Sequence, residues 1–163
     1  MRALFLTMIL AACGTASGTM NGPSMNNHIG GDQQPAVSHV VSQDIMKREP
    51  VSNHVMVKHI LIAWKDLDGD EYHVDPRAKA RTKHDAEQVV DSLVGQLRAG
   101  ADFDTLMIQN SEDAGSAATG EPFAVSPDAR LVIEFKTLGL RLNVGEIGVC
   151  ESQFGFHIMK RVE

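Results

Sequence analysis

One stretch, residues 54–64, constrains the fold more than any other part of this 163-residue chain. Its sequence, HVMVKHILIAW, is dense in β-branched residues and lacks Gly and Pro, which predicts a strand. Alternate side chains of a strand point to opposite faces, and here both faces are mainly apolar. This is typical of an interior strand in a sheet that is covered on both sides. His59 lies within one of these apolar faces, so its ring needs a polar partner from elsewhere in the chain.

The size and charge of the chain limit its class. Its length suits one domain with extensions. The formal net charge is -6 and charges of both signs are interspersed, which argues against a nucleic-acid-binding protein. The two cysteines, Cys13 and Cys150, cannot form a disulfide framework, and Cys150 is expected to be a small buried apolar residue.

The N-terminus has the order of a secretory signal. Arg2 precedes the apolar run 3–10, which is too short to span a bilayer, and small residues lead to Cys13. The sequence LAAC at residues 10–13 resembles the lipobox of bacterial lipoproteins, in which the cysteine is lipidated. We therefore interpret residues 1–12 as a signal peptide and Cys13 as a lipid anchor, without a transmembrane helix in the mature protein. The alternative is a buried helix start with an incidental cysteine.

Residues 13–50 are predicted to form a flexible tether. They are rich in Gly, Ser, Thr, Asn and Gln and offer little apolar surface to offset chain entropy. Residues 37–47 are weakly amphipathic and could form a short helix. His28 and His39 have no Cys or carboxylate at ligand spacing and are interpreted as solvated linker residues. The globular domain would then be residues 51–163.

Periodic patterns divide that domain into helices and strands. Residues 84–99 carry one apolar stripe, and Thr82 is a suitable N-cap. A shorter helix follows Asp102, and Ser126-Pro127-Asp128 predicts the start of a third helix that ends at Gly139. Residues 147–150 and 156–162 are predicted strands. The order indicates an α/β (α+β) layer fold with an antiparallel or mixed sheet.

A set of short motifs then follows in a familiar order. They are His59-Ile60-Leu61, Leu97-Arg98-Ala99-Gly100, Asn110-Ser111-Glu112-Asp113, Phe135, Val144-Gly145-Glu146-Ile147 and Phe154-Gly155-Phe156-His157-Ile158. Together they resemble parvulin-type peptidyl-prolyl cis/trans isomerases over residues 55–163. The resemblance implies a small, mostly antiparallel four-stranded sheet surrounded by about four helices, with the first and last strands adjacent at its centre.

The resemblance also implies a site. His59 and His157 would form the paired histidines of the family, Asp113 matches a position held by Cys or Asp, and Ser152 matches a hydroxyl position. Phe135 and Leu131 would form the apolar floor that receives a proline ring. The resemblance implies no cofactor and no metal. The two histidines could act on the substrate directly or could only order the sheet as a satisfied core pair.

The chain departs from the family pattern at Gly120-Glu121-Pro122-Phe123, where a Gly-Asp-Leu-Gly-like segment is usual. Pro122 or Phe123 must then supply the apolar wall. The basic cluster that phosphate-selective parvulins carry after the first strand is absent. Arg77, Lys79 and Arg81 could form a second basic patch, but we interpret residues 77–81 as a solvated loop. We therefore expect no strong requirement for phosphoserine or phosphothreonine before the proline.

These observations give one leading hypothesis. The chain would be a monomeric isomerase, lipid-anchored in the bacterial cell envelope and more plausibly at the outer membrane. It would act on proline-containing unfolded or nascent polypeptides during folding of exported proteins. The alternative is a catalytically weak or inactive parvulin-fold chaperone or binding module, which the altered Pro122-Phe123 segment favours. A metal-binding histidine protein would need ligand spacing that the sequence lacks.

Overall fold

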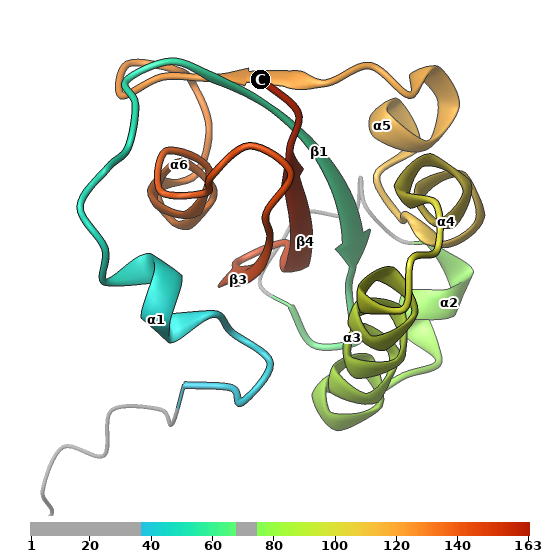
Figure 1. The fold of residues 1–163 in the computed structure, drawn as a ribbon. Coiled ribbons are helices and arrows are strands. Elements are labelled where there is room, and N and C mark those ends of the chain that lie inside the picture. Colours follow the sequence, from blue (N-terminus) through green and yellow to red (C-terminus); the bar gives the residue numbers. More distant parts are fainter. Residues whose placement is uncertain (1–36, 68–74) are drawn as a thin grey trace, which may run out of the picture. The chain divides into compact units, whose positions relative to one another are not determined.

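The computed structural model describes residues 37–67 and 75–163, so the predicted signal peptide and Cys13 lie outside the described residues. Its centre is an antiparallel four-stranded sheet with the order β2-β1-β4-β3 (Figure 1). The strands are β1 (Val55–Ile62), β2 (Phe123–Val125), β3 (Ile147–Ser152) and β4 (Gly155–Arg161). The first and last strands are adjacent at the centre of the sheet, as predicted.

Six helices lie in the described part of the chain, where about four were expected. They are α1 (Gln43–Met46), α2 (Pro76–Lys79), α3 (Lys83–Arg98), α4 (Phe103–Asn110), α5 (Ala114–Thr119) and α6 (Ile133–Gly139). The longest, α3, has 16 residues and starts with a capping box between Thr82 and Asp85. In the described residues no helix is both long enough and apolar enough to cross a bilayer.

The prediction that a helix starts at Ser126 is wrong, because α6 begins only at Ile133. The Ser126 hydroxyl donates to the Asp128 carboxylate, 2.7 Å away, and the N–H of Ala129 donates to the Ser126 carbonyl. This closes a single turn. Val132 is then extended, with φ −60° and ψ 149°, and the chain resumes a helical path after it.

Helices cover both faces of the sheet (Figure 1). Under α3 and α4 the alternate strand residues Ile60, Ile62, Phe156 and Ile158 join an entirely apolar cluster. Under α6 the intervening residues Val55, Val57 and Met159 join a second cluster. This assignment of the two faces of β1 follows from the alternation in its sequence. Cys150 is free and buried in the second cluster, and burial raises the pKa of its thiol.

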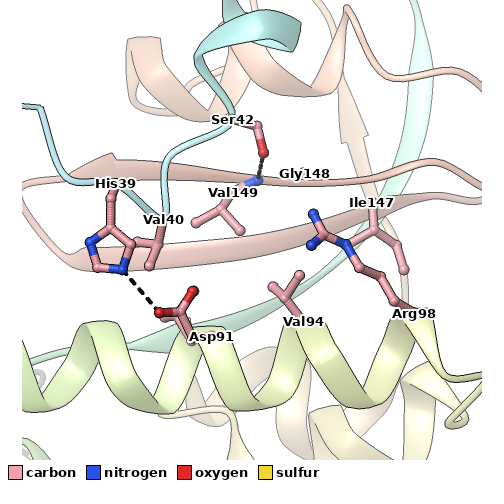
Figure 2. Close-up of a pocket in the computed structure, with 10 residues that line it drawn as sticks. His39, Val40, Ser42, Asp91, Val94, Arg98, Ile147, Gly148 and Val149 are labelled. Atoms are coloured by element: carbon pink, nitrogen blue, oxygen red, sulfur yellow. Dashed lines mark hydrogen bonds and ion pairs between the residues drawn. The ribbon is translucent and has the colours of Figure 1, made fainter.

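Residues 37–50 belong to the packed domain rather than to the expected tether, which corrects the domain boundary at residue 51. The N–H of Ser42 donates to the Val149 carbonyl (2.9 Å), and the Ser42 hydroxyl accepts from the Val149 N–H (3.0 Å). Val41 and Ile45 are buried. Short helix formation here is confirmed by α1. His39 is not simply solvated, because its Nε2 lies 2.9 Å from the Asp91 carboxylate of α3 (Figure 2).

Candidate active site

The two predicted histidines meet on the face of the sheet that α6 covers. In the register of β1 and β4, His59 pairs with Met159 and Leu61 pairs with His157. The histidines are therefore diagonal neighbours on one face. Their ring centroids lie 5.4 Å apart, and both residues are buried. The sheet thus brings together two polar rings that are far apart in sequence.

Asp113 supplies the partner that His59 lacks in the sequence. Its Oδ2 lies 2.8 Å from His59 Nε2, while its Oδ1 accepts the Gly115 N–H at the start of α5. The hydrogen bond from His59 lowers the pKa of Asp113 to about 2, although partial burial acts in the opposite direction. An ionised carboxylate can only accept hydrogen bonds. His59 therefore carries a proton on Nε2, and this N–H donates a hydrogen bond to Asp113.

Glu112 and Ser111 hold this carboxylate in place by completing the edge of β1. Because β2 pairs only with residues 55–57, the later part of β1 has no strand on that side. There the N–H of Glu112 donates to the Leu61 carbonyl (2.9 Å), and the Glu112 carboxylate accepts the Ala63 N–H (2.7 Å). The Ser111 hydroxyl accepts the Leu61 N–H (3.1 Å). The sequence motif contains both residues, but neither was assigned a role.

The charge of the Glu112 carboxylate is balanced inside the protein by a neighbouring arginine. Its side chain is only 1% exposed, and burial raises the pKa of its carboxyl group. The Arg81 guanidinium lies 2.6 Å from the Glu112 carboxylate and opposes that shift. Removing Arg81 would leave this buried carboxylate with the more distant Arg77 guanidinium, 3.8 Å away, as its counter-ion.

Ser152 is the partner of His157. Its Oγ lies 2.8 Å from His157 Nε2 and accepts the N–H of Phe154. Burial lowers the pKa of His157 to about 3, and the neighbouring His59 acts in the same direction. His157 is therefore neutral at neutral pH. Within the described residues, Nδ1 of each histidine is buried without a hydrogen-bond partner.

The hairpin that carries Ser152 and His157 depends on a glycine. Gly155 has φ +131°, and a Cβ atom at this position would lie 2.5 Å from the Ile62 carbonyl oxygen. A larger residue would therefore be strained and would push β4 away from β1. This explains in physical terms why Gly stands between the two phenylalanines before His157.

Aromatic side chains surround the histidine pair. The ring of Phe135, on α6, lies edge-on to the rings of His59 and His157, with centroid distances of 5.1 Å and 5.3 Å. Phe123, on β2, stacks on His59 with a centroid distance of 4.9 Å and an interplanar angle of 23°. Pro122 precedes it and is half-buried. Phe123 thus covers His59, but neither Pro122 nor Phe123 is among the residues that line the pocket beside it.

An open pocket of about 450 Å³ lies beside this cluster. It is lined by Arg130, Leu131, Val132, Phe135, Phe154 and His157. Three of these, Leu131, Phe135 and His157, were predicted from the sequence. In the described residues, no group of three or more His, Cys, Asp or Glu side chains is placed to hold a metal ion.

Comparison with known families identifies the architecture. Residues 42–163 match the model of the PPIC-type PPIASE domain, the parvulin-type peptidyl-prolyl isomerases. The chain belongs to this family. The predicted parvulin-type isomerase domain is therefore confirmed over most of the chain.

Curated relatives and solved structures agree with this family. The foldase protein PrsA of Geobacillus kaustophilus is 27% identical over 124 residues, covering 74% of this chain and 43% of that protein. The chaperone SurA of Ralstonia nicotianae is 35% identical over 88 residues, covering 53% of this chain and 18% of that protein. The chain therefore spans less than half the length of these curated relatives.

Two solved structures show the shared fold. The solution structure of TbPIN1 has a TM-score of 0.58 and 22% identity, covering 69% of this chain and 99% of that one. The peptidyl-prolyl isomerase ESS1 from Candida albicans has a TM-score of 0.57 and 21% identity, covering 68% of this chain and 63% of that one. The predicted fold class is thereby confirmed.

In this PPIC-type domain two basic residues after β1, Arg77 and Arg81, bind to other groups of the protein. Arg77 donates to the Asp75 carboxylate (2.7 Å) and to backbone carbonyls of residues 109–111. Arg81 is paired with Glu112. The interpretation of residues 77–81 as a solvated loop is wrong for these two arginines, since they link α2 and its C-terminal turn to the loop before α5.

Sequence reasoning missed three residues of the PPIC-type pocket. Phe154 belongs to the motif that ends in His157, so its neighbourhood was a usable signal. Arg130 and Val132 lie in the segment that was predicted to be helical. The segment is not helical there, because residues 129–131 form a bend and Val132 is extended before α6. Periodicity could not indicate that.

Proposed function

We propose that this domain accelerates cis/trans isomerisation of Xaa-Pro bonds in proline-containing unfolded or nascent polypeptides. The observation that carries the proposal is an open pocket in which Phe135, Leu131 and His157 present mainly apolar surface beside a buried polar network. A proline ring is apolar and compact, and such a pocket can hold it by excluding water.

The barrier to be lowered comes from amide resonance and is about 18–20 kcal/mol. Planar amides are more polar than twisted ones, because resonance separates charge between oxygen and nitrogen. Moving the bond from water to an apolar site therefore costs the planar forms more than the twisted transition state. Each 1.36 kcal/mol of this difference gives about a tenfold increase in rate. No covalent bond has to break.

In this proposal the polar network positions the pocket rather than attacking the substrate. Asp113 fixes the ring of His59, and Ser152 fixes the ring of His157. Phe135 packs its edge against both rings, so the orientation of the histidines sets the position of the pocket floor. A neutral His157 adds polarity to the wall without adding charge.

We propose that phosphorylation of the residue before proline is not required. The supporting observation is that Arg77 and Arg81, two of the three basic residues at positions 77–81, are held by Asp75 and Glu112. A doubly charged phosphate would have to displace a carboxylate already in place.

We further propose that the protein is a monomer, lipid-anchored through Cys13 in the bacterial cell envelope at the outer membrane, where it assists folding of exported proteins. The support is the lipobox-like sequence at residues 10–13 and the similarity to proteins named foldase and chaperone. Mass spectrometry of the membrane fraction tests the anchor, since a Cys13→Ala variant would lose the acyl mass and remain in the soluble fraction.

A refolding assay limited by prolyl isomerisation tests the isomerase proposal. The chain should accelerate the slow phase catalytically, and Phe135→Ala should reduce this by at least tenfold because the ring floor is lost. Phe135→Leu retains most of the volume and controls for loss of folding. Ile108→Ala, on the exposed side of α4, is the matched surface control and should keep full activity. No acceleration by the unmodified chain would refute the proposal.

A binding module without catalysis is the second candidate. The stacking of Phe123 on His59 favours it, because this aromatic residue stands in a segment that departs from the usual family pattern. NMR exchange measurements on Xaa-Pro peptides separate the two functions. A binding module shifts peptide resonances without increasing the cis/trans exchange rate, whereas an isomerase increases it.

A further inference from the structure

One side chain at the pocket has a charge that the proposed isomerisation does not use. Arg130 lines the pocket and is exposed. It is the one charged residue in the lining, since its neighbours there are apolar apart from His157, which burial keeps neutral. A guanidinium group at the mouth of an otherwise uncharged pocket can recognise an anionic group of a ligand.

Arg130 has no hydrogen bond or ion pair to any residue in the described ranges 37–67 and 75–163. Most of the other described arginines are engaged by carboxylates or backbone carbonyls. These are Arg48, Arg77, Arg81, Arg141 and Arg161. Arg130 therefore contributes little to the fold, and its charge is available to a ligand.

Two charged groups near Arg130 in sequence, Asp128 and Lys136, have hydrogen-bond partners of their own. The Asp128 carboxylate accepts the Ser126 hydroxyl at 2.7 Å, and this hydrogen bond lowers the pKa of Asp128. Lys136, the next cation along the chain, donates to the Pro127 carbonyl at 3.0 Å. Asp128 and Lys136 thus have partners other than Arg130, which itself has none in the described residues.

We propose that Arg130 is a specificity-determining residue that selects substrates carrying a carboxylate side chain next to the proline. This inference rests on the proposed function, because it requires the proline ring to occupy the Leu131 and Phe135 surface. A residue adjacent to that proline would then lie at the pocket mouth, within reach of a long arginine side chain. The planar guanidinium can hold a carboxylate with two parallel hydrogen bonds.

The test uses short single-proline peptides in which Glu, Gln or Lys stands immediately before or after the proline. NMR exchange gives kcat/KM for each peptide, and resonance shifts give its Kd. In one of the two positions, Glu should be favoured over Lys by about fivefold at low salt, the upper range for an exposed ion pair. The preference should shrink in 0.5 M NaCl, because salt screens exposed charges.

Variants then assign the preference to Arg130. Arg130→Gln should reduce the Glu-to-Lys ratio to near 1, and Arg130→Glu should reverse it. The ratio is informative because any general loss of activity cancels. Arg98→Gln is the matched control: this arginine is also exposed and unpaired in the described residues, but it borders the separate hollow between α3 and β3 (Figure 2). It should leave the ratio unchanged.

The outcomes distinguish this inference from the proposed function. Equal kcat/KM and Kd values for Glu, Gln and Lys peptides would overturn the role of Arg130 while leaving the isomerase intact. A preference that survives Arg130→Gln would also overturn it. If no peptide exchanges faster, the isomerase proposal fails, and the Kd values alone still decide whether Arg130 selects carboxylates.

Discussion

The two faces of the sheet are built from alternate residues of the same strands but differ in kind. The face under α3 and α4 is built around an apolar cluster that includes Ile60 and Phe156, and Lys58 on this face forms an ion pair with Asp104 of α4. The face under α6 places two histidines, a serine and an open pocket among its apolar residues. The difference shows that the same short strands can form an apolar core on one face and the candidate active site on the other. Stability and function can therefore be perturbed separately by mutations on opposite faces.

The largest expected effect is loss of stability on the apolar face. Leu93, on α3, is 3% exposed, and Leu93→Ala should reduce the free energy of unfolding by about 2–5 kcal/mol because it leaves a cavity. Urea denaturation measures this. The folded fraction should keep normal kcat/KM, since Leu93 does not line the pocket. A stability loss below 1 kcal/mol would contradict the view that this face provides most of the stability.

The next effect is the pH dependence that His157 contributes on the face with the site. The folded pKa of His157, about 3, lies below its ordinary value of 6.5, so the unfolded chain binds a proton that the folded chain excludes. Stability is therefore retained above pH 6.5 and lost as pH falls toward 3, by about 1.4 kcal/mol per pH unit at most. Asp113, with a lowered pKa of about 2, adds a further loss at lower pH.

Comparison with His157→Gln isolates this contribution. The free energy of unfolding of both proteins is measured in urea from pH 7 to pH 4.5. The value for the unmodified chain minus the value for His157→Gln should decrease steadily as pH falls and can become negative. Contributions common to both proteins, such as the raised pKa of Glu112, largely cancel. Parallel pH profiles would show that His157 does not carry the effect.

Leu131→Ala is the counterpart of Leu93→Ala on the face with the site. Leu131 is only half-buried and lines the pocket, so its truncation should cost at most about 1 kcal/mol of stability. It should, however, lower kcat/KM about tenfold because the proline ring loses apolar contact. Peptide exchange kinetics and urea denaturation on the same sample check both values. A large stability loss with normal activity would reverse the proposed division of roles.

The smallest expected effect on activity is that of Ser152→Ala. It removes the hydroxyl that bonds His157 and accepts the Phe154 N–H. The loss should be about 1–2 kcal/mol of stability, the cost of unpaired buried polar groups. Activity should fall only a few-fold if the serine positions His157. A drop of a thousandfold would instead indicate a direct role of the hydroxyl in catalysis.

Sequence patterns predicted the parts of the fold that are fixed by local periodicity. The alternation in β1 assigned its residues to the correct faces, and the Thr82 N-cap and the apolar stripe located α3. The three-residue strand β2 was not located, because Phe123–Val125 is too short for a period-two pattern. It forms through pairing with residues 55–57, which is a tertiary effect.

Long-range contacts also explain the remaining errors. Residues 37–50 look polar in composition, yet Val41 and Ile45 become buried once Ser42 bonds to Val149. At the site, family resemblance grouped His59, His157, Asp113 and Ser152, and the structure shows which of them pair: His59 with Asp113, and Ser152 with His157. The free charge of Arg130 depends on its neighbours' partners, which no local pattern encodes.

The bonding of Ser42 to β3 has a consequence for how the protein resists aggregation. β3 is an outer strand of the sheet, and the backbone N–H and C=O of Val149 would otherwise be free to pair with another chain. Residues 37–50 thus cover part of that edge of the sheet. A fragment beginning at residue 51 would keep the pocket residues yet expose a template for strand addition, and self-association would follow from cutting a segment remote from the site.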